Sequence, residues 1–192
     1  MRVFLAVLVL IFSLQSWTKA DDISDFQIEG MSIGDSLLDY FTEAQISNSK
    51  KFYYPKSNKF VGILSNIFNK NLNTFEAIQF AVNLDTYEIV SIAGKIYKFK
   101  NNKKKCYNEM EKIFDEIILL FPNSKIVKEK EDAHDYDKSG KSLAKVYKIL
   151  LKNGRIAVTC TDWAENIDIS DSLKVAIQKS EFMDWINNEA YK

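Results

Sequence analysis

One short stretch, Lys152-Asn153-Gly154-Arg155, constrains the fold more than any other part of the chain. Apolar residues alternate with polar residues on both sides of it, from Ser142 to Trp163. Asn-Gly is the pair typical of a type I′ turn, which joins two antiparallel strands through two residues. The sequence therefore predicts a β-hairpin that turns at Asn153-Gly154.

This turn also predicts which residues face one another across the hairpin. The expected pairs are Lys152 with Arg155, Leu151 with Ile156, Ile149 with Val158, and Tyr147 with Cys160. The apolar partners then share one face, which we expect to be buried because an antiparallel sheet commonly packs one face on a core. The opposite face is expected to be polar.

The remaining chain alternates between segments with strand and helix patterns. Three expected strands between Lys59 and Phe99 are joined by short links, and strands joined in this way must pair antiparallel. The clearest helix follows them, and a capping-box pattern at Ser32-x-x-Asp35 predicts an earlier one. The expected elements are strands in Lys59–Ile67, Thr74–Leu84, Tyr87–Phe99 and Leu173–Ile177, and helices after Ser32, over Lys103–Phe121 and from Ser180. Together they predict an α+β fold of two layers, a mostly antiparallel sheet of about six strands with helices on one face.

The first twenty residues have the layout of a secretory signal peptide. Arg2 precedes the apolar run Val3–Leu14, and Thr18-Lys19-Ala20 places small residues at the positions typical of a cleavage site. An uncleaved anchor is the alternative, but the run is shorter than the roughly 20 residues that a bilayer requires. We therefore expect cleavage near Ala20, a single domain over residues 21–192, no membrane anchor after cleavage, and a periplasmic or secreted protein.

The charge balance argues against nucleic acid as a partner. The chain has 26 basic and 26 acidic residues, and cleavage would remove Arg2 and Lys19 but no acidic residue. Proteins dedicated to nucleic acid normally carry a strong basic excess. A slightly acidic mature chain lacks that excess.

Two cysteines, Cys106 and Cys160, are present. An even number of cysteines in an exported chain indicates a disulfide. The alternative is a reactive thiol, because Cys106 lies near the start of the predicted helix and directly after Lys103, Lys104 and Lys105, and both features lower a thiol pKa. We expect the disulfide.

His134, the only histidine, lies among Glu131, Asp132 and Asp135. Such a group could act as a base or bind a metal, but a polar, solvated loop explains the same composition. Asp135, Asp137 and Ser139 also match part of a calcium-binding loop, although the position that requires a bidentate Glu is Val146. We therefore predict no metal site and no cofactor, and leave open whether these three residues bind a cation.

The polar face of the hairpin is the best-supported candidate for a binding surface. Its residues are Lys148, Lys152, Arg155, Thr159 and Thr161, together with Lys174 of the next strand. Such a surface suits an unknown protein or an anionic ligand of the cell envelope. We expect a non-enzymatic binding module. The alternative is a periplasmic hydrolase or thiol enzyme that uses His134 or Cys106.

Two stretches resemble a group of small exported proteins of AT-rich marine bacteria. They are Ile28-Glu29-Gly30-Met31-Ser32-Ile33-Gly34-Asp35-Ser36-Leu37-Leu38 and Thr161-Asp162-Trp163. The Gly-Met-Ser stretch is also similar to small envelope modules of the outer-membrane assembly lipoprotein type, but the lipid-bearing Cys of those modules is absent. Neither resemblance implies an activity or a catalytic residue.

Overall fold

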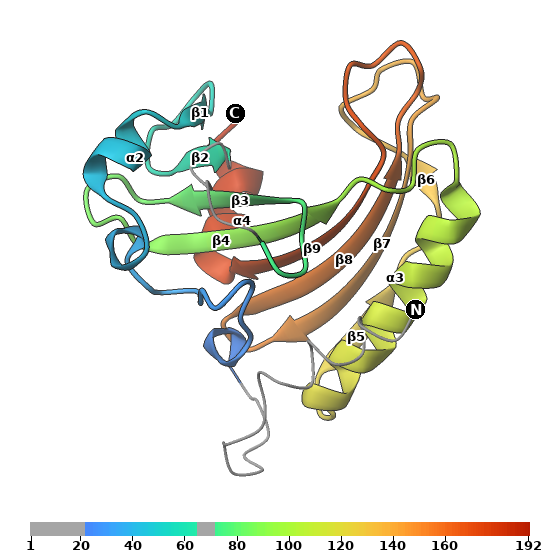
Figure 1. Cartoon of the computed structure of the whole chain (residues 1–192), viewed down its shortest axis with the longest axis horizontal. Coiled ribbons are helices and arrows are strands. Elements are labelled where there is room, and N and C mark those ends of the chain that lie inside the picture. The colour runs from blue at the N-terminus through green and yellow to red at the C-terminus, as the bar shows by residue number, and fades with distance from the viewer. Residues whose placement is uncertain (1–21, 65–71) are drawn as a thin grey trace.

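The computed structural model describes residues 22–64 and 72–192, and these residues form an α+β fold. One antiparallel sheet of nine strands runs in the order β1-β2-β3-β4-β9-β8-β7-β5, with β6 paired to β7 beside this path (Figure 1). The strands are β1 (Lys50–Tyr53), β2 (Val61–Leu64), β3 (Ala77–Val82), β4 (Ile89–Ile96), β5 (Lys125–Lys128), β6 (Asp132–Ala133), β7 (Leu143–Leu151), β8 (Gly154–Asp162) and β9 (Ser172–Lys179). The helices are α2 (Glu43–Ser47), α3 (Lys103–Leu120) and α4 (Ser180–Asn188), and two short 3₁₀ helices, η1 (Ile23–Asp25) and η2 (Leu37–Asp39), precede them.

The predicted hairpin is present, but its register differs by two residues from the prediction. Leu151 pairs with Gly154, Ile149 with Ile156 and Tyr147 with Val158. The two loop residues are therefore Lys152 and Asn153, and Gly154 belongs to β8. Side chains in a strand alternate with period two, so a shift of two leaves every residue on its predicted face.

Gly154 serves strand packing and not the turn geometry that the Asn-Gly pair indicated. Its φ is not in the positive region that a type I′ turn requires. A Cβ at this position would lie 2.2 Å from the backbone oxygen of Gln178 in β9 and 2.8 Å from Cδ1 of Ile23. Glycine is needed because β8, β9 and the N-terminal segment approach so closely here.

Helix α3 packs on one face of the sheet, which we call the α3 face. The helix buries Cys106, Met110, Phe114 and Ile117, which recur at the three- and four-residue spacing of one helix side. The buried residues of the α3 face include Phe80, Ile92, Ile149, Ile156, Val158 and Ile177. This confirms the predicted helix and the predicted apolar face of the hairpin.

Helix α4 packs on the other face, the α4 face, so the expectation of helices on one face is wrong. Its Phe182 and Trp185 form a second buried cluster with Phe60, Ala81 and Val90. Ala81 is adjacent in β3 to Phe80 of the α3 face, and adjacent strand residues point to opposite faces. The amphipathic pattern of α4 shows that one side of the helix is buried, but not against which face of the sheet. That depends on the direction in which the chain turns between β9 and α4, which follow one another directly.

The segment after Ser32 does not form the helix that the capping-box pattern predicts. The Asp35 carboxylate does accept a hydrogen bond from the Ser32 N–H at 2.8 Å, as in a capping box. However, Gly34 has a φ of +93°, and the backbone pairs with the start of β4, where the Gly34 N–H donates to Ile89 O at 2.9 Å. Pairing with the sheet replaces helical hydrogen bonds, and only the three residues of η2 are helical.

Three strands, β1, β5 and β6, lie in segments where no strand was predicted. They account for the difference between nine strands and the expected number of about six. Their residues are mostly exposed, so these strands have too few buried positions to show a clear alternation in sequence. They are held by pairing with the predicted strands β2 and β7.

Two sequence predictions fall outside the described residues. They are the signal peptide over residues 1–20 and the part of the Lys59–Ile67 strand beyond Leu64. Within residues 22–64 and 72–192, no helix is both long enough and apolar enough to cross a membrane.

Candidate functional site

Three basic side chains share the α4 face on adjacent strands. Lys95 of β4 pairs directly with Lys174 of β9, and Lys174 pairs with Thr159 of β8. Arg155 lies on the same face four residues before Thr159, opposite Gln178. We call Lys95, Arg155 and Lys174 the cationic cluster.

Small residues lie between the two ends of this cluster. Ala93 of β4, Ala176 of β9 and Ala157 of β8 are paired and form one row across the sheet. On the same face, Lys174 lies two residues before Ala176 in β9, and Arg155 lies two residues before Ala157 in β8. Same-face rows of a strand are about 7 Å apart, which is less than the length of a lysine or arginine side chain. The long basic side chains therefore have room to lean over the alanines and approach one another.

Burial affects all three cations of the cluster, and Lys174 is also affected by the charges of the other two. Burial, together with the positive charges of Lys95 and Arg155, lowers the pKa of Lys174 to about 8. Burial also lowers the pKa of Lys95 and of Arg155, and for Arg155 the more distant charge of Glu129 opposes this effect. An ammonium group in this position is destabilised by its surroundings, and a bound anion would relieve that.

The cluster has no acidic counterpart in the described part of the chain. No Asp or Glu of residues 22–64 and 72–192 makes an ion pair with Lys95, Arg155 or Lys174. The Arg155 Nε–H donates to Gln178 Oε1 at 2.8 Å, which fixes the guanidinium and leaves its Nη groups for other acceptors. Unpaired cations at low exposure are costly, and a binding site is a common reason to retain them.

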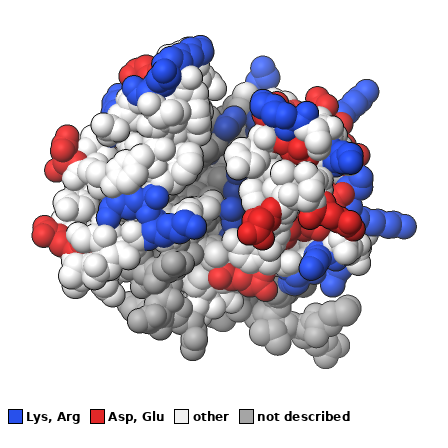
Figure 2. All heavy atoms as spheres, turned by 90° about the horizontal axis from the view of Figure 1, so that it is seen from above, with Lys and Arg blue, Asp and Glu red and all other residues white. Residues whose placement is uncertain are grey.

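Seen from above, a hollow separates the part with β1, β2 and the C-terminus from the part with the long loops beside β6 and β9, and Lys and Arg side chains line it (Figure 2).

The other predicted residues of the binding face, Lys148, Lys152, Thr159 and Thr161, lie outside the cationic cluster. Lys148 forms an ion pair with Glu129, so its charge is already compensated. Lys152 lies in the β7–β8 loop and is exposed. Thr159 and Thr161 share the face with Lys174, and their hydroxyl groups add donors beside it.

Lys95 was missed by the sequence analysis. Its strand was predicted, but the pairing of β4 with β9 joins residues about 80 positions apart and follows from no local pattern. The alternation within Tyr87–Phe99 places Lys95 on the opposite face of the strand from the buried Ile92 and Ile96. That was the available signal that Lys95 belongs to the polar face.

His134 lies beside Trp163 and not within a group of acids. The two ring centroids are 4.4 Å apart, and Tyr136 contacts the same indole edge to face at 6.0 Å. His134 Nδ1 accepts a hydrogen bond from the Tyr136 N–H at 3.2 Å. Burial and then the charge of Lys174 lower the pKa of His134, against the opposing effect of Asp135 and Asp137, so the neutral ring is favoured at pH 7.

The calcium-loop pattern has a structural use in this fold. Asp137 accepts hydrogen bonds from the backbone N–H groups of Ser139 and Ser142 and from the Ser142 hydroxyl, at 2.7–2.9 Å. These bonds from Ser139 and Ser142 hold the pKa of Asp137 well below its usual range. Within the described ranges, no group of three or more His, Cys, Asp or Glu residues could hold a metal ion.

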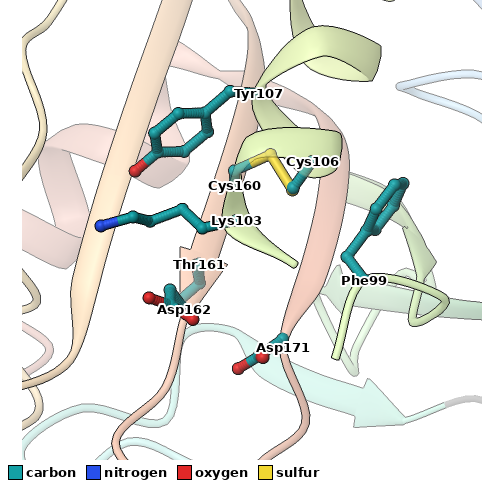
Figure 3. A pocket seen from close by; sticks show the side chains of 8 residues that line it. All are labelled: Phe99, Lys103, Cys106, Tyr107, Cys160, Thr161, Asp162 and Asp171. Atoms are coloured by element: carbon teal, nitrogen blue, oxygen red, sulfur yellow. A yellow bond between two sulfur atoms is a disulfide. The ribbon is translucent and has the colours of Figure 1, made fainter. Parts of the chain in front are cut away.

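Cys106 and Cys160 form the predicted disulfide, which joins the first turn of α3 to β8. Neither cysteine is a free thiol, so the thiol-enzyme alternative for Cys106 is wrong. Figure 3 shows the recess beside this disulfide, with Lys103, Tyr107, Asp162 and Asp171 around it. Its volume of about 10 Å³ admits one water molecule at most, which is too small for a substrate.

Comparisons with known proteins add no relative. No protein-family model, no curated protein and no solved structure matches this chain. The resemblance of Ile28–Leu38 and Thr161–Trp163 to small exported bacterial proteins therefore stays a prediction.

Proposed function

We propose that this chain is an exported, non-enzymatic binding module, and that the cationic cluster on its α4 face binds an anionic ligand of the cell envelope. The observation that carries this proposal is that Lys95, Arg155 and Lys174 share one sheet face and form no ion pair with a carboxylate of the described residues. A bound anion would supply the missing negative charge and raise the pKa of Lys174 towards its ordinary value.

Export is proposed on two grounds. The sequence over residues 1–20 has the layout of a secretory signal, with cleavage near Ala20 that leaves residues 21–192 as one domain. The disulfide between Cys106 and Cys160 is typical of oxidising compartments such as the periplasm or the exterior. Cell fractionation of a bacterial host, with N-terminal sequencing of the exported chain, tests this; a cytoplasmic chain that keeps Met1 would contradict export.

Binding is favoured over hydrolysis by the position of His134. Its Nδ1 already accepts the Tyr136 N–H, and its ring packs on Trp163, so a proton would have to leave or enter through Nε2 alone. The charge that lowers the pKa of His134 is that of Lys174. This arrangement suits a side chain that lines a charged binding site better than a general base that a carboxylate orients.

Isothermal titration with inorganic sulfate and phosphate tests the proposed anion site. The double variant Lys95→Met/Lys174→Met keeps apolar side chains of similar length but removes two charges. We expect saturable anion binding by the wild-type protein and at least tenfold weaker binding by this variant. Lys152→Met, in the exposed β7–β8 loop, is the matched control and should bind as the wild type does.

Two results would contradict the proposal. One is that the wild-type protein binds neither sulfate nor phosphate above the level of chloride. The other is that the double variant, with a native circular dichroism spectrum, binds as tightly as the control. Arg155→Met provides an independent variant at the other end of the cluster, and it should also weaken binding.

A further inference from the structure

Aromatic side chains lie at one end of the cationic cluster. Trp163 follows Thr161 by two residues, so it continues on the α4 face beyond the end of β8. His134 packs on its indole with centroids 4.4 Å apart, and the charge of Lys174 acts on the His134 ring. The aromatic pair therefore lies next to the end of β8 and within electrostatic range of Lys174.

Part-buried hydrogen bonds hold the backbone at Trp163, although this residue lies in a loop. The Trp163 N–H donates to Asp171 Oδ1 at 2.7 Å, and the other oxygen of this buried carboxylate accepts from the Asn101 N–H at 3.0 Å. The next residue, Ala164, donates its N–H to the hydroxyl of Ser142 at 3.0 Å. A backbone fixed at Trp163 loses little conformational entropy when a ligand packs against this residue.

The chemistry of the pair complements that of the cations. His134 is favoured in its neutral form, so it extends the apolar surface of Trp163 and adds no fourth positive charge. Both side chains are only partly buried, which leaves surface for a ligand. Indole faces bind flat rings by stacking and burial of apolar area.

From this juxtaposition we infer that Trp163 and His134 form an aromatic subsite, and that the ligand is an anionic group attached to a flat ring. The inference rests on the proposed anion site and adds the part of the ligand that lies next to the anion. The anionic group lies against Lys95, Lys174 and Arg155, and the ring lies against the indole of Trp163. No bond is made or broken in this account.

A pair of phosphate monoesters separates the two parts of the site. Methyl phosphate carries the anion alone, and phenyl phosphate carries the same anion with a ring. We expect the wild-type protein to bind phenyl phosphate about tenfold more tightly in isothermal titration, the size of effect that one stacked ring gives. The variant Trp163→Leu should bind both esters with affinities within about twofold of each other, and should bind methyl phosphate as the wild type does.

Three further measurements complete the design. Tyr53→Leu, an exposed aromatic on β1, is the matched control and should keep the preference for phenyl phosphate. His134→Phe should also keep it, because a ring is retained. In the wild-type protein the indole N–H resonance of Trp163 should shift on addition of phenyl phosphate and much less on addition of methyl phosphate, a test that requires no variant.

The outcomes distinguish this inference from the proposed function. Equal affinity of the wild-type protein for the two esters would overturn the aromatic subsite and leave the anion site in place. A preference that survives Trp163→Leu, or a Trp163 resonance that does not move, would place the ring elsewhere and overturn the assignment. Failure of both esters to bind would overturn the proposed function as well.

Discussion

Removal of the disulfide should destabilise the protein strongly, because Cys106 and Cys160 close a long loop. The two residues are 54 positions apart, and the closed loop contains β5, β6 and β7 as well as most of α3 and β8. Both cysteines are buried, at 3% and 2% exposure, so the bond joins α3 to the middle of the sheet.

The expected magnitude follows from the chain entropy of the unfolded state. A cross-link that closes a loop of this length reduces that entropy by an amount worth about 4 kcal/mol at 25 °C. A domain of ordinary stability has about 5–15 kcal/mol in total, so the loss is a large share. With a urea m-value of about 2 kcal/mol/M, the midpoint of unfolding should fall by about 2 M.

Urea unfolding followed by circular dichroism, with and without dithiothreitol, measures this shift. The variant Cys106→Ala/Cys160→Ala serves as the control, because dithiothreitol should not change its midpoint. A shift of less than about 0.5 M in the wild-type protein, with an unchanged m-value, corresponds to roughly 1 kcal/mol and would contradict a stabilisation of about 4 kcal/mol by the disulfide. The bond would then constrain little that the packing of α3 does not already hold.

Three further changes have expected outcomes. Gly154→Ala should lower the free energy of unfolding by about 2–3 kcal/mol in urea titrations, because the new Cβ would lie 2.2 Å from the backbone oxygen of Gln178; an unchanged midpoint would contradict the close approach of β8 and β9. Asp137→Asn should lower stability at pH 7 and remove part of the loss of stability that the wild type shows as the pH falls below about 4, because hydrogen bonds from Ser139 and Ser142 lower the pKa of Asp137 in the folded state; parallel pH profiles of the two proteins would count against this. Lys174→Met should flatten a rise in wild-type stability between pH 8 and about 10.4, since a Lys whose folded pKa is lowered binds fewer protons folded than unfolded in that range; a flat wild-type profile would argue against the burial of Lys174.

Much of the sheet could be predicted because strand alternation is a local signal. The hairpin illustrates both the strength and the limit of this signal. Apolar alternation placed Ile149 and Ile156 on the buried face and Arg155 on the polar face, which the structure confirms. The turn was placed one residue too late because Asn-Gly was taken as turn chemistry, whereas Gly154 is required by contact with Gln178 of β9.

Features that depend on contacts between distant segments could not be predicted. The pairing of Lys95 with Lys174 joins β4 to β9, and this pairing completes the cationic cluster. The side of the sheet that α4 covers depends on how the chain leaves β9. The helix predicted from Ser32-x-x-Asp35 does not form because Gly34 and Asp35 pair with Ile89 instead. The disulfide, by contrast, followed from the number of cysteines and the expected compartment.

The pKa of the Lys174 ammonium, with and without inorganic sulfate, tests the anion site most directly. Lysine-selective NMR can follow its titration while sulfate stays a dianion throughout. The charges that act on Lys174 are those of Lys95 and Arg155, and the charge of Lys174 in turn acts on the His134 ring. We expect a pKa of about 8 for Lys174 in chloride and a clear rise in sulfate, because the bound anion would compensate the positive charges of the cluster. A pKa near the ordinary lysine value in both solutions, or a lowered value that sulfate does not change, would contradict this expectation.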